Sequence, residues 1–149
     1  MYRPRVTTRS SDAERLLTTL ARFNRWATRS AQVEHDIVVA RLLSLVDELQ
    51  PVRISTLAAA DHTTQPTMTA HVRRLEDTGF LRREADPSDA RASLISLSEA
   101  GTRALTDIRT ARTAALLPHL DALTDADVAT LTAAADVLDR ILGRSAASA

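Results

Sequence analysis

The side chains best suited to chemistry are the polar groups in the stretch from Thr64 to Arg74. They are hydroxyls, an amide, an imidazole and two guanidinium groups, which recognise a partner through hydrogen bonds and charge. Covalent catalysis is not indicated, because the chain has no G-x-S-x-G context for a nucleophile. Nucleotide chemistry is not indicated either, because the chain has no Gly-rich phosphate loop. We therefore expect a binding protein and not an enzyme.

A metal site or cofactor is not expected either. The chain has no Cys, and its four His are far apart, without the H-E-x-x-H spacing of a catalytic zinc site. His71 lies at the edge of a predicted packed helix face, where a structural role is expected. His35 could line a ligand pocket beside the first helix, whereas His119 carries no assignment.

Apolar spacing decides which side of the polar stretch faces outwards. A helix is predicted from Gln65 to Thr78, N-capped by Thr64, with Pro66 in its first turn and Gly79 after its end. Within it, Met68, Val72 and Leu75 recur at i, i+4 and i+7 and predict a buried face. Opposite that face or on its flanks lie Gln65, Pro66, Thr67, Thr69, Ala70, Arg73, Arg74 and Asp77.

The residues before this helix predict a helix-turn-helix. A short helix from Ser55, its predicted N-cap, to Ala60 is followed by a turn, and small Ala58 suits the contact between the two helices. His62 is among the residues that tolerate the positive φ such a turn requires. The second helix of such a pair enters the DNA major groove. Gln65 could then pair with adenine, Thr67 or Thr69 with several bases, and Arg73 and Arg74 with phosphates.

The next segment predicts a β-hairpin, with strands near Phe80–Glu84 and Ala92–Leu97 around the turn Asp86–Asp89. Four further helices are expected from apolar periodicity and end signals. They are Ser11–Ser30, capped by Ser10 or Ser11 with Asp12 and Glu14 in its first turn; Glu34–Leu49, ended by Pro51; a helix from Ser98 that Pro118 interrupts; and a helix from Thr124 to Gly143.

These elements predict a mainly α protein with a small β-wing, in which a winged helix-turn-helix is flanked by dimerisation helices. We expect three segments: an N-terminal dimerisation helix in residues 1–33, the DNA-binding domain in residues 34–98 and C-terminal dimerisation helices in residues 99–149. One recognition helix reads only about three to five base pairs, so two copies are needed for usable specificity.

The stretch from Ile54 to Gly101 resembles the MarR family of winged-helix regulators. This stretch covers about a third of the chain, and the matching pieces within it are Leu57–Ala58, Thr67–Thr69, Val72–Arg83, Asp86–Arg91 and Ile95–Gly101. The resemblance implies a triangular homodimer that binds a palindromic operator. We expect a repressor, and an activator remains the open alternative. The resemblance also implies release from DNA when a small, often phenolic, ligand binds.

The resemblance also assigns roles in the wing. The family's D-x-R-D-x-R-like pattern is matched by Asp86, Asp89 and Arg91, with Ser88 in place of the middle Arg. Asp86 and Asp89 are then expected to support the wing, and Arg91 to reach into the minor groove, where Arg is favoured. Ala70 stands where the family often has a polar or basic residue, which leaves apolar contact with a thymine methyl.

Charge leaves one alternative open. The net charge is zero, and all 19 basic residues are Arg, with seven of them in residues 1–32. DNA binding must therefore come from individual Arg residues on one surface. The rival interpretation is a winged-helix protein–protein adaptor that does not bind DNA, which the acid-balanced centre favours slightly.

Ligand-pocket residues cannot be assigned from the sequence. Tyr2, Phe23 and Trp26 are three of the four aromatic residues, and they predict dimer-core packing or a pocket for a small aromatic effector. The chain has no apolar run of about 18 residues and no signal-peptide core near Met1, so we expect a cytoplasmic protein without a membrane partner.

Overall fold

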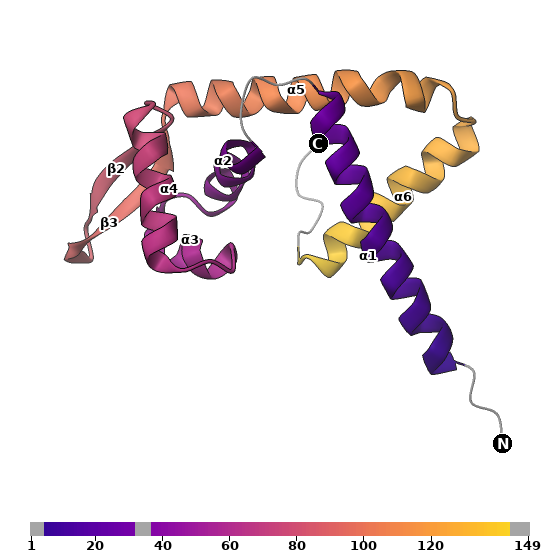
Figure 1. Ribbon diagram of the computed structural model, residues 1–149, viewed down its shortest axis with the longest axis horizontal. Helices are drawn as coiled ribbons and strands as arrows, with labels where there is room; N and C mark the ends of the chain where they lie inside the picture. Colours follow the sequence, from indigo (N-terminus) through magenta and orange to yellow (C-terminus); the bar gives the residue numbers. More distant parts are fainter. Residues whose placement is uncertain (1–4, 32–36, 144–149) are drawn as a thin grey trace.

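The computed structural model describes residues 5–31 and 37–143, which form six helices and a small sheet (Figure 1). In chain order the elements are α1 (Arg5–Ser30), α2 (Ile37–Leu49), β1 (Val52–Arg53), α3 (Ile54–Ala60), α4 (Gln65–Asp77), β2 (Leu81–Asp86), β3 (Asp89–Leu97), α5 (Glu99–Asp121) and α6 (Asp125–Ile141). The predicted fold class is confirmed: a mainly helical chain with a helix-turn-helix and a β-hairpin wing.

The sheet is antiparallel with the strand order β1–β3–β2. Leu81 pairs with Leu97 and Arg83 with Ile95, and the register shifts between Ala85 and Asp86, next to the turn of the hairpin. The sequence predicted this hairpin but not β1, which consists of two residues. On β1, Val52 pairs with Ile95, so β3 is the central strand.

A single core joins α2, α3, α4, the sheet and the first half of α5. Its fully buried side chains include Leu43, Leu57, Met68 and Ile95, one each from α2, α3, α4 and β3. Burial of such side chains contributes about 1.5–3 kcal/mol each. These elements therefore form a folded lobe that holds the helix-turn-helix and the wing together.

The other end of the molecule is open. Figure 1 shows α5 running from this lobe past the end of α1, which meets it near its middle, to α6 at its far end. No residue of α6 is buried, and apolar side chains such as Leu17, Leu131 and Ile141 are more than half exposed. None of the described helices is both long and apolar enough to span a membrane.

Several predicted helix ends are confirmed. The side chain of Thr64 accepts from the N–H of Thr67 at the start of α4, and that of Thr124 accepts from the N–H of Asp127 at the start of α6. Gly79 and Gly143 follow the ends of α4 and α6 with φ of 77° and 70°, a conformation that glycine adopts without steric cost.

Three predicted ends are wrong. α1 begins at Arg5 and not at Ser11, because no Gly or Pro separates these residues, so Asp12 and Glu14 are not in its first turn. The N-cap of α3 is Arg53 and not Ser55. Arg53 takes the extended conformation of an N-cap because it pairs with Leu94 in the sheet.

The third error concerns Pro118, which does not interrupt α5: the helix continues to Asp121. A proline removes one N–H donor and disturbs the carbonyl four residues earlier, here that of Ala114, an exposed residue. Water can satisfy that carbonyl, and only three residues of the helix follow. The predicted start of the second helix at Glu34 lies outside the described residues.

Candidate nucleic-acid interface

The orientation of α4 determines the candidate interface. Met68 and Val72 are fully buried and Leu75 is 2% exposed, so the predicted inner face is confirmed. α4 packs against α3, where Ala58 is also buried. The polar side of α4 consequently faces solvent, and all eight candidate residues are exposed: Thr64, Gln65, Pro66, Thr67, Thr69, Ala70, Arg73 and Arg74.

The first turn of α4 is held by its threonines. The Thr64 and Thr67 hydroxyls share a hydrogen bond of 2.8 Å, and the Thr67 N–H donates to Thr64 Oγ1 at 3.3 Å. The hydroxyl of Thr69 donates to the carbonyl of Gln65 at 2.7 Å. Its hydrogen is therefore engaged, and Thr69 presents a methyl group and an acceptor oxygen to an incoming ligand.

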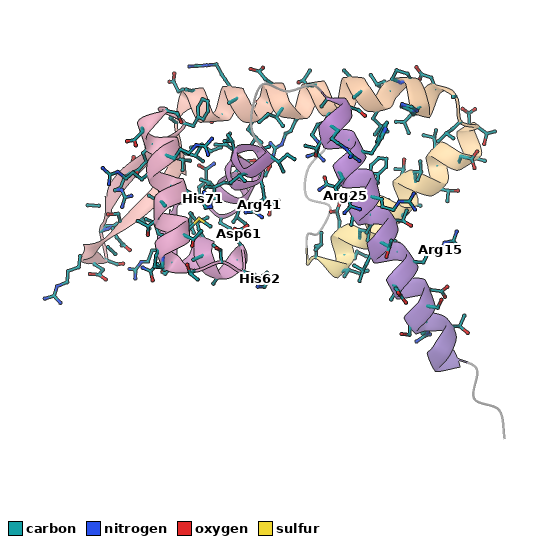
Figure 2. The ribbon with its side chains drawn as sticks, in the orientation of Figure 1. Arg15, Arg25, Arg41, Asp61, His62 and His71 are labelled. Atoms are coloured by element: carbon teal, nitrogen blue, oxygen red, sulfur yellow. The ribbon has the colours of Figure 1, made fainter. Side chains whose placement is uncertain are left out.

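The turn between α3 and α4 has the geometry that the sequence predicted. His62 has φ of 52°, and the Thr63 N–H donates to the carbonyl of Ala58 at 3.0 Å. Arg41 of α2 donates to the Asp61 carboxylate at 3.1 Å, which ties α2 to this turn. Figure 2 shows Arg41 and Asp61 side by side, with His62 at the outer end of the turn.

The wing is braced at its base by a buried carboxylate. Asp86, 6% exposed, accepts from the Ser88 hydroxyl at 2.6 Å, from the Ser88 N–H at 2.8 Å and from Arg53 Nε at 2.8 Å. The bonds from Ser88, followed by the neighbouring Arg53 guanidinium, lower the pKa of Asp86 to about 2. Asp86 is therefore ionised at neutral pH.

Arg53 is a functional candidate that sequence reasoning missed. It also donates to the Ser88 hydroxyl at 3.3 Å and lies 3.9 Å from the Asp89 carboxylate, so a β1 residue connects both sides of the hairpin turn. Asp86 is 33 residues away in sequence. No local pattern signals such a contact, since it depends on β1 pairing with β3.

The arginines near this face differ in their partners. Arg82 pairs with Glu84 at 3.2 Å, and Arg83 pairs with Glu76 at 2.8 Å. Arg73 on α4 and Arg91 on the wing are exposed, and neither has a side-chain partner among the described residues. The backbone N–H of Arg91 donates to Asp89 at 3.1 Å, which shapes the wing beside the free guanidinium. Two unneutralised cations therefore accompany the polar face of α4.

A cleft of about 420 Å³ lies between α1, α2, the end of α3 and α5. Ile37, Ala40 and Leu45 supply apolar lining, and Arg41, Asp61 and Arg112 supply charge. Arg112 donates to the side chain of Asn24 on α1. The cleft thus combines apolar surface with two guanidinium groups and with the carboxylates of Asp61 and Glu48.

The aromatic and histidine residues lie mostly outside this cleft. Phe23 and Trp26 contact each other on α1 with ring centroids 5.6 Å apart, and Trp26 meets His119 of α5 edge-on at 4.8 Å. His71 is half-buried beside Val38 and Leu42 of α2, as expected of a structural histidine. His35 and Tyr2 lie outside the described residues.

The packing of α3 against α4, followed by the braced hairpin, defines a winged helix-turn-helix protein. The MarR family model matches residues 39–93, which cover α3, α4 and most of the wing. A solved protein from Pseudomonas aeruginosa PA01 with a proposed role as a transcriptional regulator is similar over 91% of this chain and 96% of its own, at 30% identity and a TM-score of 0.75. The chain belongs to the MarR family of transcription regulators.

Two further solved structures share this fold. CouR from Rhodococcus jostii RHA1, bound to p-coumaroyl-CoA, is 27% identical over 89% of this chain and 92% of its own, with a TM-score of 0.61. A MepR mutant from S. aureus, bound to an oligodeoxyribonucleotide, is 18% identical over 89% of this chain and 97% of its own, with a TM-score of 0.60. No curated protein sequence matches the chain.

Proposed function

We propose that this MarR-family protein is a homodimeric, ligand-responsive repressor that binds a palindromic operator. In this proposal α4 enters the major groove and Arg91 reaches the adjacent minor groove. The observation that carries the proposal is the burial of Met68, Val72 and Leu75, which turns Thr69 and Arg73 outwards.

The contact residues divide by chemistry. Gln65 and Thr67 at the start of α4 are assigned to base edges, and Thr69 offers an acceptor and a methyl group there. Ala70 and Pro66 can make apolar contact with a thymine methyl. Arg73 and Arg74 are assigned to phosphates, and the N–H groups of the first turn, beside Thr64, add donors for a phosphate.

Dimerisation is supported by the open end of the molecule. Leu16, Leu17 and Leu20 on α1 and Leu131 and Ile141 on α6 are exposed in the single chain. Apolar surface of this extent on terminal helices indicates a protein interface. We assign dimerisation to residues 1–33 and 99–149 and DNA binding to residues 34–98, so that the two recognition helices meet half-sites about one helical turn apart.

The ligand response is assigned to the cleft beside Arg41. A bound carboxylate or phosphate would compete with Asp61 for the Arg41 guanidinium, and Asp61 is the C-cap residue of α3, directly before His62. Losing that ion pair would alter the turn that sets the position of α4. CouR is bound to p-coumaroyl-CoA, so this thioester and free p-coumarate are suitable first probes.

The experiment that tests the function is selection of bound duplexes from a random pool, followed by titration at several salt concentrations. A specific DNA-binding dimer should enrich an inverted repeat, and its affinity should fall steeply with salt. The adaptor alternative, which the zero net charge favours, predicts no enriched sequence. For the ligand response, p-coumaroyl-CoA should release DNA from the native protein, and Arg41→Ala should abolish that release without abolishing DNA binding.

A further inference from the structure

We propose that the Glu76–Arg83 ion pair is a positioning element that sets the angle of the wing to α4, so that Arg73 and Arg91 reach the same DNA half-site together. This inference rests on the DNA-binding function proposed above. Arg83 Nε donates to Glu76 Oε1 and Arg83 Nη2 donates to Glu76 Oε2, both at 2.8 Å. Two parallel bonds between planar groups fix their orientation as well as their separation.

The pair bridges the two elements that must act together. Glu76 is in the last turn of α4, and Arg83 is the third residue of β2. Backbone hydrogen bonds fix the turn directly after α4: the Gly79 N–H donates to the carbonyl of Glu76, and the Phe80 N–H donates to the carbonyl of Leu75. We call this turn the corner between α4 and β2. Beyond that corner, the side chain of Arg83 bonds β2 directly to α4.

The side chains in the middle of β2 do not reach the core, and there β2 is held by its pairing with β3. Leu81 and Asp86 at the two ends of β2 are buried, whereas the four residues between them are exposed. Arg53 holds the Asp86 end from β1, and Glu76 holds Arg83 from α4. The wing is therefore braced from two sides. Releasing Glu76 removes the side-chain bond between β2 and α4 and leaves the backbone corner and the β1–β3 pairing to set the angle of the hairpin.

A direct role of Arg83 at phosphates is less well supported by its geometry. Its guanidinium faces Glu76, and that carboxylate neutralises its charge. Its neighbour Arg82 pairs with Glu84, which lies on the same strand. The Arg82–Glu84 pair cannot set the angle between β2 and α4, so it provides a matched control.

The test is a double-mutant cycle on the full-length protein and a selected operator duplex. Dissociation constants are measured for the native protein, Glu76→Gln, Arg83→Gln and Arg82→Gln, each with and without Arg91→Ala. We expect Arg91→Ala to weaken binding about tenfold in the native and Arg82→Gln backgrounds. In the Glu76→Gln and Arg83→Gln backgrounds, Arg91→Ala should raise the dissociation constant by less than about threefold, because the wing contact is already lost.

The two disrupting variants change the net charge in opposite directions. If the pair acts by position, both weaken binding; if bulk charge dominates, Glu76→Gln strengthens it and Arg83→Gln weakens it, which overturns the proposal. An equal cost of Arg91→Ala in every background also overturns it. Arg83→Lys, which keeps the charge but not the bidentate geometry, should bind less tightly than the native protein, and unchanged binding would count against the idea.

Failure of the underlying function has a different signature. A native protein that enriches no duplex removes the DNA-binding proposal and this inference together. A native protein that binds DNA and loses affinity with Arg91→Ala, but shows an additive cycle, removes only the inference. Hydroxyl-radical protection of the minor groove at the outer end of each half-site should disappear in Glu76→Gln while protection under α4 remains.

Discussion

Arg73 and Arg91 differ from the neighbouring Arg82 and Arg83 in having no carboxylate partner among the described residues. A guanidinium already paired with a carboxylate is partly neutralised and has fewer N–H donors left for a phosphate. The guanidinium groups of Arg73 and Arg91 keep their full charge and all their donors. At this scale, affinity for DNA is a property of which arginines are left unpaired.

We expect Arg73→Ala and Arg91→Ala each to weaken operator binding about tenfold and to leave the dimer intact. In a plot of log affinity against log salt concentration, the magnitude of the slope should be smaller by about one for Arg73→Ala, since one phosphate contact is lost. Fluorescence anisotropy at several salt concentrations measures both effects. Arg103→Ala, an exposed change on α5 away from the interface, is the control, and an equal loss there would contradict the assignment.

The lowered pKa of Asp86 predicts a pH dependence of stability. The folded value of about 2 lies below the ordinary 3.8, so the ionised carboxylate stabilises the folded protein above about pH 4. That contribution is lost as the pH falls from about 4 towards 2. Asp86→Asn should be less stable than the native protein at neutral pH, and the difference should shrink over this range in urea titrations. A constant difference would argue against an ionised Asp86 in the wing.

The start of α5 packs so closely against the backbone of Phe80 that it requires a glycine at position 101. A Cβ built on Gly101 would collide with the backbone carbonyl of Phe80, which accepts the N–H of Ser98. Ser98 also accepts the Gly101 N–H and donates to the carbonyl of Gly79. The start of α5 is therefore packed directly against the end of the α4–β2 corner.

Gly101→Ala should destabilise the protein by about 1–3 kcal/mol, the range for inserting a methyl group into a packed site. The measurement is the free energy of unfolding in urea. Gly143→Ala is the control, because a Cβ there meets no atom within 4 Å and only the strain of its φ of 70° opposes it. A smaller effect at Gly101 than at Gly143 would show that the corner yields easily.

Elements were predictable from the sequence where the signal is local and repeated. The buried face of α4 follows from the spacing of Met68, Val72 and Leu75, and its cap from Thr64 followed by Pro66. The start of α1 was misplaced because Ser10 and Ser11, followed by Asp12 and Glu14, have the pattern of a helix start, although the helix already begins at Arg5.

Contacts between elements were not predictable in the same way. The bonds of Arg53 with Asp86 depend on strand pairing across 33 residues. The bond of Arg83 with Glu76 depends on the angle at which β2 leaves α4. Side-chain types alone contain neither quantity, so the sequence indicated Asp86 as a support but not the residue that binds it.

The molecule as a whole consists of a packed lobe and an open pair of helices joined by α5. The lobe buries its own core, whereas α1 and α6 leave apolar surface exposed. The charges of these two helices are opposite in balance, since α1 carries several Arg and α6 four Asp against Arg140. We propose that association of two copies covers this surface.

Leu20→Asp and Leu131→Asp should each shift the protein towards a monomer, because a charge would enter an apolar contact. Operator affinity should fall by more than tenfold, since each lobe then binds its half-site alone. Sedimentation at several concentrations measures the association state. The exposed change Thr106→Asp on α5 is the control, and a variant of Leu131 that remains dimeric would exclude α6 from the interface.

The unbroken course of α5 through Pro118 has a mechanical consequence. A continuous helix of 23 residues is a stiff rod about 34 Å long, so a tilt of about 10° at one end carries the other end through about 6 Å. That sweep exceeds the tolerance of hydrogen bonds to base edges. In the proposed dimer, a tilt of this size where the two copies meet would be enough to move both copies of α4 out of register with the groove.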